Sequence, residues 1–88
     1  MKLKVKSIEH LKELSDVDRD GMEHFEGCIR LNGNLNSSKS IWYFKKADSW
    51  DILNESDGSE AEYDSTEEMI ENEEFLIQAI NEGSLWTH

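Results

Sequence analysis

Apolar and polar residues alternate with a period of two through the middle of the chain. This is the period of a β-strand, whose successive side chains point to opposite faces of a sheet. The pattern predicts four antiparallel strands, at residues 25–31, 40–46, 49–53 and 61–63. Turn residues stand in two of the links, at Asn32-Gly33-Asn34 and at Asp57-Gly58. Consecutive strands with short links favour a meander.

The segment 40–46 is the strongest of these strands, because four large apolar residues follow one another from Ile41 to Phe44. Such a run predicts a central strand that is covered on both faces, with Trp42, Tyr43 and Phe44 in the core. The last strand is short and is flanked by Glu60 and Glu62. Charge of this kind is typical of a strand at the edge of a sheet.

A short helix is predicted near the N-terminus, after a stretch in which Lys alternates with Leu3 and Val5 and weakly indicates an edge strand. Ser7 is a suitable N-cap, and apolar residues follow it at helical spacing. The helix is expected to end near Ser15 and to depend on packing, since two turns are not stable alone.

A second helix is predicted from a capping box at Ser65 and Glu68, in which each side chain bonds a backbone N–H of the first turn. Met69 and Ile70 are expected to face inward. The apolar period then breaks.

Glu73 stands where that period calls for an apolar residue. Asn72 is therefore expected to cap another short helix, which carries Phe75 and Leu76 inward and ends with Gly83 in the left-handed conformation. Leu85 and the residue after it form an apolar tail.

These elements predict one α+β domain over residues 1–88. It consists of an antiparallel sheet of about four strands, with the N-terminal helix and one or two C-terminal helices packed on one face. The single Cys28 cannot form a disulfide within the chain, which favours a reducing compartment. No apolar run is long enough to span a membrane, so we expect a cytoplasmic protein.

Charge is distributed unevenly along the chain, whose formal net charge is −11. Residues 1–46 hold all nine Lys and Arg and seven acids, while residues 47–88 hold thirteen acids and no base. Such a half repels nucleic acids and anionic membranes and attracts basic surfaces, although it can also serve solubility alone. The candidate acidic interaction surface comprises Glu55, Asp57, Glu60, Glu62, Asp64, Glu67, Glu71 and Glu74.

Asp16, Asp18, Asp20 and Gly21 match the first half of a calcium-binding loop, where alternate carboxylates converge on the cation. The match fails at the twelfth position, where Gly27 replaces the closing glutamate. The alternative is an acidic turn between helix and strand.

A small-anion site is a further hypothesis, because four residues could converge where the first two strands meet: Arg30, Ser37, Ser38 and Lys39. In the alternative, the serines bond the loop backbone and Arg30 pairs with Glu26 or Glu55.

No catalytic group emerges from the sequence. Cys28 and His24 lie on one face of one strand, about 13 Å apart at strand spacing, which is too far for a hydrogen bond. His10, His24 and His88 are scattered and no zinc spacing occurs. We therefore expect neither an enzyme nor a cofactor.

Three segments taken in order resemble a family of short bacterial proteins with no assigned reaction. They are residues 31–39 (LNGNLNSSK), 54–59 (NESDGS) and 79–85 (AINEGSL), and the resemblance extends over residues 25–86. It implies a fold and carries over no catalytic residue.

The hypothesis preferred from the sequence is a non-enzymatic module that binds another protein, and the acidic half of the chain favours a basic partner. One alternative is an inhibitor or immunity-type protein that mimics nucleic-acid phosphates and blocks a basic cleft. Another is a domain that binds calcium or a small anion.

Overall fold

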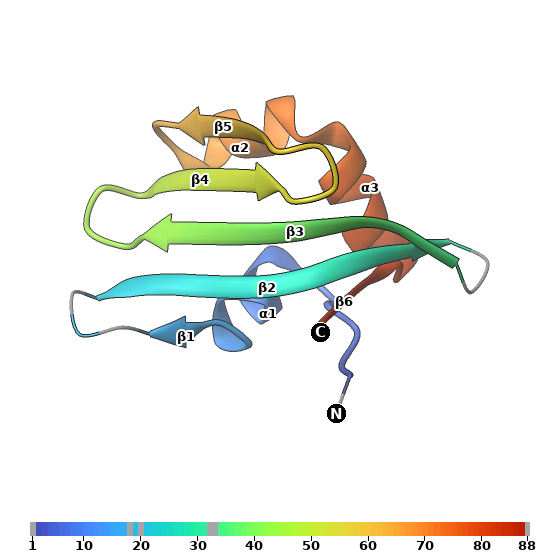
Figure 1. The fold of residues 1–88 in the computed structure, drawn as a ribbon. Helices are drawn as coiled ribbons and strands as arrows, with labels where there is room; N and C mark the ends of the chain where they lie inside the picture. The colour runs from blue at the N-terminus through green and yellow to red at the C-terminus, as the bar shows by residue number, and fades with distance from the viewer. Residues whose placement is uncertain (1, 18, 20, 32–33, 88) are drawn as a thin grey trace.

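An antiparallel sheet with helices on one side forms the protein in the computed structural model, which describes residues 2–17, 19, 21–31 and 34–87 (Figure 1). In chain order its elements are α1 (Ile8–Glu13), β1 (Asp16–Val17), β2 (Met22–Leu31), β3 (Asn34–Phe44), β4 (Ser49–Asn54), β5 (Ser59–Tyr63), α2 (Thr66–Asn72), α3 (Glu74–Glu82) and β6 (Leu85–Thr87).

The strands follow one another across the sheet in the order β1-β2-β3-β4-β5, and β6 also pairs with β2. The predicted α+β class and the meander are confirmed, but the sheet is larger than four strands. The apolar tail adds a strand, because β6 pairs with β2 on one side and bonds the N-terminal segment on the other. Val5 donates its N–H to the carbonyl of Leu85 at 2.8 Å, and Thr87 donates to Leu3 at 2.9 Å.

The core lies between the inner face of the sheet and the three helices, which all lie on the same side of it (Figure 1). Strand register places Phe25, Ile41 and Ile52 side by side on this face. The helices contribute Leu11, Met69, Leu76 and others to the same cluster. Each large apolar side chain that is fully buried there contributes about 1.5–3 kcal/mol.

The outer face of the sheet, by contrast, carries no helix (Figure 1). Ile41 and Tyr43 are buried on the inner face, whereas Trp42 and Phe44 point to the outer face and are only half-buried. The prediction that strand 40–46 is covered on both faces is therefore wrong. The reason is that side chains alternate across the sheet, and the only helical layer covers one face.

The helix caps predicted at Ser7 and Ser65 are confirmed. Ser7 Oγ accepts a hydrogen bond from the N–H of His10, and Ser65 Oγ accepts one from the N–H of Glu68, each at 3.0 Å. The carboxylate of Glu68 reaches back to the N–H of Asp64, one residue before the cap. These hydrogen bonds fix the first turns of α1 and α2 at the residues where the sequence predicts the helices to begin.

The break between α2 and α3 falls at Glu73, where the backbone leaves the helical region with ψ 56°. Asn72 remains in α2 and donates its side-chain amide to the carbonyl of Glu68, so the prediction that it caps α3 is wrong. The expectation that Ile70 and Phe75 face inward is also wrong, because they are 41% and 51% exposed. Their neighbours in the helices occupy the space over the sheet. Gly83 ends α3 with φ 72°, as predicted.

A polar network ties the β3–β4 turn to the start of α2. Tyr43 donates its hydroxyl to Asp48 at 2.7 Å, Thr66 donates its hydroxyl to the same oxygen at 2.6 Å, and the Trp50 indole donates to Thr66 at 2.9 Å. The hydrogen bonds from Thr66 and Tyr43 lower the pKa of Asp48. Burial and the contact with Asp48 raise the pKa of Tyr43 to about 12.

Gly27 lies where strand β6 and the ring of Phe25 leave no room for a side chain. A Cβ atom at this position would lie 2.4 Å from the carbonyl oxygen of Trp86 and 2.5 Å from the ring of Phe25. Strand β6 can therefore pair with β2 only because the side chain at position 27 is a hydrogen.

We predict that Gly27→Ala lowers the free energy of unfolding by about 3 kcal/mol, since backbone of β6 must move to admit the methyl group. Gly58→Ala is the matched control, because Gly58 has φ 75° and nothing within 4 Å of its Cβ position. Its cost is conformational only, about 1 kcal/mol. Urea denaturation measures both variants, and an equal loss would contradict the close packing at Gly27.

A second prediction concerns alkaline pH. Burial and the hydrogen bond to Glu73 raise the pKa of Tyr63 to about 12, as burial and Asp48 do for Tyr43. The fold therefore favours the protonated phenols. Their contribution to stability is complete below the ordinary value of 10.0 and is lost as pH rises towards 12.

Tyrosinate absorbance tests this, with urea midpoints measured across the same range. We expect both tyrosines to ionise near pH 12 in the folded protein, and we expect Tyr63→Phe to flatten the decline in stability. Ionisation of both at the ordinary tyrosine pKa in the folded state would disprove the prediction.

Candidate functional site

The outer face of the sheet is the surface that the helices leave open. It is defined by residues that alternate with the core positions: Met22, His24, Glu26 and Cys28 in β2, Ser38, Ser40, Trp42 and Phe44 in β3, Asp51 and Leu53 in β4, and Glu60 and Glu62 in β5. Two of these residues, Cys28 and Ser40, are nevertheless buried.

A stacked pair of rings lies on the β2–β3 half of this face. His24 and Trp42 are directly opposite each other in the register, and their rings are parallel within 6° at a centroid distance of 4.6 Å. The Nε2 atom of His24 lies 3.9 Å from a carboxylate oxygen of Glu26. The outer face therefore carries a stacked pair of rings beside an acid.

Carboxylates gather on the other half of the face. Asp51 is directly opposite Glu62 across β4 and β5, and Glu60 follows two residues before Glu62. One carboxylate oxygen from each of the three lies within 4.8 Å of the others. Partial burial, with the charge of Glu60, raises the pKa of Asp51. Like charges directly opposite in a sheet destabilise it, so this cluster costs free energy in the isolated protein.

Asp51, Glu60 and Glu62 are donors of the kind that Ca²⁺ and Mg²⁺ take. They supply three ligands, whereas calcium takes about six to eight, and Glu60 and Glu62 are exposed. Neither of the ion pairs found in the described part of the chain involves them. We therefore interpret them as an unneutralised acidic cluster.

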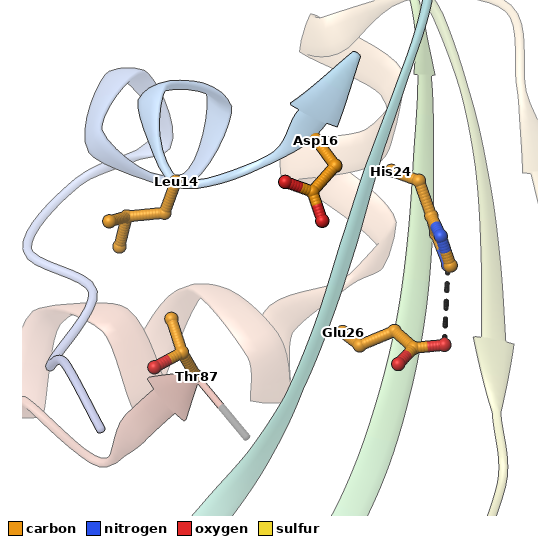
Figure 2. Close-up of a pocket in the computed structure, with 5 residues that line it drawn as sticks. All are labelled: Leu14, Asp16, His24, Glu26 and Thr87. Atoms are coloured by element: carbon orange, nitrogen blue, oxygen red, sulfur yellow. Dashed lines mark ion pairs between the residues drawn. The ribbon is translucent and has the colours of Figure 1, made fainter. Parts of the chain in front are cut away.

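A polar notch opens beside the stacked rings at the edge of β2. Strands β1 and β6 both pair with β2 there, at His24 and at Gly27, and leave a gap between them. Figure 2 shows Asp16, Leu14 and Thr87 on one side of β2, with the His24–Glu26 ion pair on the other. The cavity measures about 350 Å³. Acids thus flank the aromatic pair on both sides.

The eight predicted acidic residues are all exposed but do not form one continuous row. Glu60 and Glu62 belong to the outer face, and Glu55 borders it by accepting a hydrogen bond from Ser40 at 2.7 Å. Asp57 lies in the β4–β5 turn and Asp64 precedes α2. Three lie on the helices: Glu67 and Glu71 on α2, and Glu74 on α3.

The pleat of β3 separates the three candidate anion ligands that lie in this strand. Ser37 and Lys39 are buried on the inner face, whereas Ser38 points to the outer face. Arg30 has its Nε atom buried with no hydrogen-bond partner in the described structure, and so does Ser37 with its hydroxyl. Glu26 and Glu55, the partners considered for Arg30, contact His24 and Ser40 instead.

The candidate calcium turn is described only in part. Asp16 lies in β1 and is paired with His24, while Asp18 and Asp20 lie outside the described residues.

Cys28 is completely buried, opposite Ser38 and Trp86, while the ring of His24 stacks on Trp42. The arrangement gives this thiol no access to a substrate.

Sequence reasoning missed His24, Trp42 and Asp51 as parts of one surface. The strand register places these residues directly opposite one another, in one row with Glu62. The sequence carries the alternation but not the register. The hydrophobicity of residues 41–44 concealed that alternation.

Searches with this chain find no match among protein-family models, curated proteins or solved structures. The resemblance to short bacterial proteins therefore remains an expectation. Across the described residues, the helices are too short and too polar for any to cross a membrane.

An open outer face has a direct consequence for stability. We predict that Trp42→Ala lowers the free energy of unfolding by about 1 kcal/mol, because it removes one ring stack and partial burial. Trp50→Ala, the matched change on the inner face, is expected to cost about 4 kcal/mol, since Trp50 is fully buried. Urea denaturation compares the two, and similar losses would show that the outer face is covered.

Proposed function

We propose that the protein is a non-enzymatic binding module that uses the outer face of its sheet to bind a basic surface of another protein. The observation that supports this most strongly is the composition of the open face. A parallel pair of aromatic rings stands there, with Asp16 and Glu26 on one side and the unneutralised cluster of Asp51, Glu60 and Glu62 on the other. The helices pack elsewhere and leave this surface accessible.

Two physical effects fit such a role. Large, half-buried rings such as Trp42 are the side chains that contribute most to affinity at protein interfaces. The carboxylates of Asp51, Glu60 and Glu62 attract a basic partner and repel acidic ones, which increases the association rate and selectivity. The net charge of −11 acts in the same direction over longer distances. We further propose that the binding takes place in the cytoplasm.

A second candidate is a sharper form of the first, in which the face imitates nucleic acid. A strand of nucleic acid presents two features to a basic cleft, namely stacked rings and the negative groups beside them. Here Trp42 is directly opposite Asp51, so the rings and the acids are neighbours on one face. The protein would then inhibit a nucleic-acid-binding partner, and an oligonucleotide would compete with it.

The proposed function predicts that binding depends on where the negative charges lie on the protein and not on its total charge. The sheet variant Asp51→Asn/Glu60→Gln/Glu62→Gln and the helix variant Glu67→Gln/Glu71→Gln/Glu74→Gln each remove three negative charges. Each protein is immobilised and exposed to cell lysate. For proteins that the immobilised wild type retains, we expect the sheet variant to retain about tenfold less. The helix variant is expected to retain as much as the wild type.

Salt and competition complete this experiment. Retention is expected to fall steeply as the NaCl concentration rises, because exposed charges are screened. Equal losses with both variants, or retention that salt does not change, would contradict a role for the outer face. Release of the retained protein by single-stranded DNA would favour the nucleic-acid mimic.

A further inference from the structure

Strand β5 forms an open edge of the sheet. It pairs with β4 over residues Ser59–Tyr63, and no other strand of the described chain pairs with its far side. In Figure 1 it borders the sheet, with α2 behind it and not beside it in the plane of the strands. An edge of this kind carries backbone groups that a further strand can bond.

The hydrogen-bond pattern identifies which residues of β5 face outward. Glu55 donates its N–H to Ser38 of β3 at 2.9 Å, so residues of odd number in β4 bond towards β3. Backbone direction alternates along a strand, and therefore Ile52 and its even-numbered neighbours bond towards β5. Their partner Ala61 faces β4, whereas Glu60 and Glu62 direct their N–H and C=O groups to the open edge.

These same two residues carry the charge on that edge. Their side chains lie on the outer face, within 4.8 Å of Asp51 at the carboxylate oxygens. Protective charges at an edge exclude strands of the same sign, and this edge excludes acidic segments and a second copy of this acidic chain. A basic strand is the one kind that its charge attracts.

We propose, on the basis of the proposed function, that the basic partner contributes an extended segment that pairs antiparallel with β5. Lysine or arginine occupies alternate positions of this segment, directly opposite Glu60 and Glu62. Their backbone groups bond those of β5, and their side chains reach the three carboxylates. Strand addition of this type obtains affinity from main-chain hydrogen bonds and specificity from alternate side chains.

The probe for this inference is a nine-residue peptide of alternating Lys and Val, titrated into the ¹⁵N-labelled protein and followed by NMR. We expect the amide signals of Glu60 and Glu62 to shift more than those of Ala61. A peptide of alternating Glu and Val serves as the charge control and is expected not to bind.

Backbone methylation separates strand addition from simple charge attraction. In the proposed pairing the Lys N–H groups face β5 and the Val N–H groups face away. N-methylation of the central lysines is therefore expected to weaken binding about tenfold or more, while N-methylation of the central valines leaves binding unchanged.

Equal binding of the two methylated peptides, or failure of the unmodified peptide to shift Glu60 and Glu62, would overturn strand addition. The proposed function would survive that result if the sheet variant still loses the proteins retained from lysate. If the sheet and helix variants retain them equally, the proposed function itself fails.

Discussion

The alternation of side chains across one antiparallel sheet, combined with a single layer of helices, determines the rest of this structure. Alternate residues in the middle of β2, β3 and β4, such as Phe25, Ile41 and Ile52, enter the core, and the residues between them face outward. An 88-residue chain has a limited core, and its three short helices cover one face of the sheet. The register that buries Ile41 and Tyr43 therefore places Trp42 on the outer face, where it is half-buried.

The charge of the outer face is unfavourable for the isolated fold. Asp51 is opposite Glu62 with no cation of the described chain paired to either, and partial burial raises the pKa of Asp51. The polar network around Asp48 shows the contrasting case, in which each hydrogen bond to the carboxylate favours its charged form. The carboxylates of the outer face thus lower the stability of the free protein, whereas Asp48 is stabilised by hydrogen bonds. This contrast is consistent with a binding site whose charges a partner neutralises.

Local signals in the sequence were sufficient for much of the fold. The existence of the four main strands, the caps Ser7 and Ser65 and the end of α3 at Gly83 depend on neighbours a few residues away. The strand predicted at 40–46 has other bounds, since β3 spans Asn34–Phe44. The predictions failed where contacts between residues far apart in the sequence determine the structure. The pairing of β6 with β2 needs the close approach at Gly27, and the two faces of β3 differ only because the helices pack on one of them. The candidate site was predicted as an acidic half, but its aromatic component required the register.

Accessibility of the outer face is the central claim, and solvent paramagnetic relaxation measured on the tryptophan indole N–H signals tests it most directly. A soluble gadolinium chelate is expected to broaden the Trp42 signal strongly in the free protein and to leave that of the buried Trp50 sharp. When a retained basic partner is added, Trp42 is expected to become protected. Equal protection of Trp42 and Trp50 in the free protein, or no change for Trp42 on binding, would contradict the account.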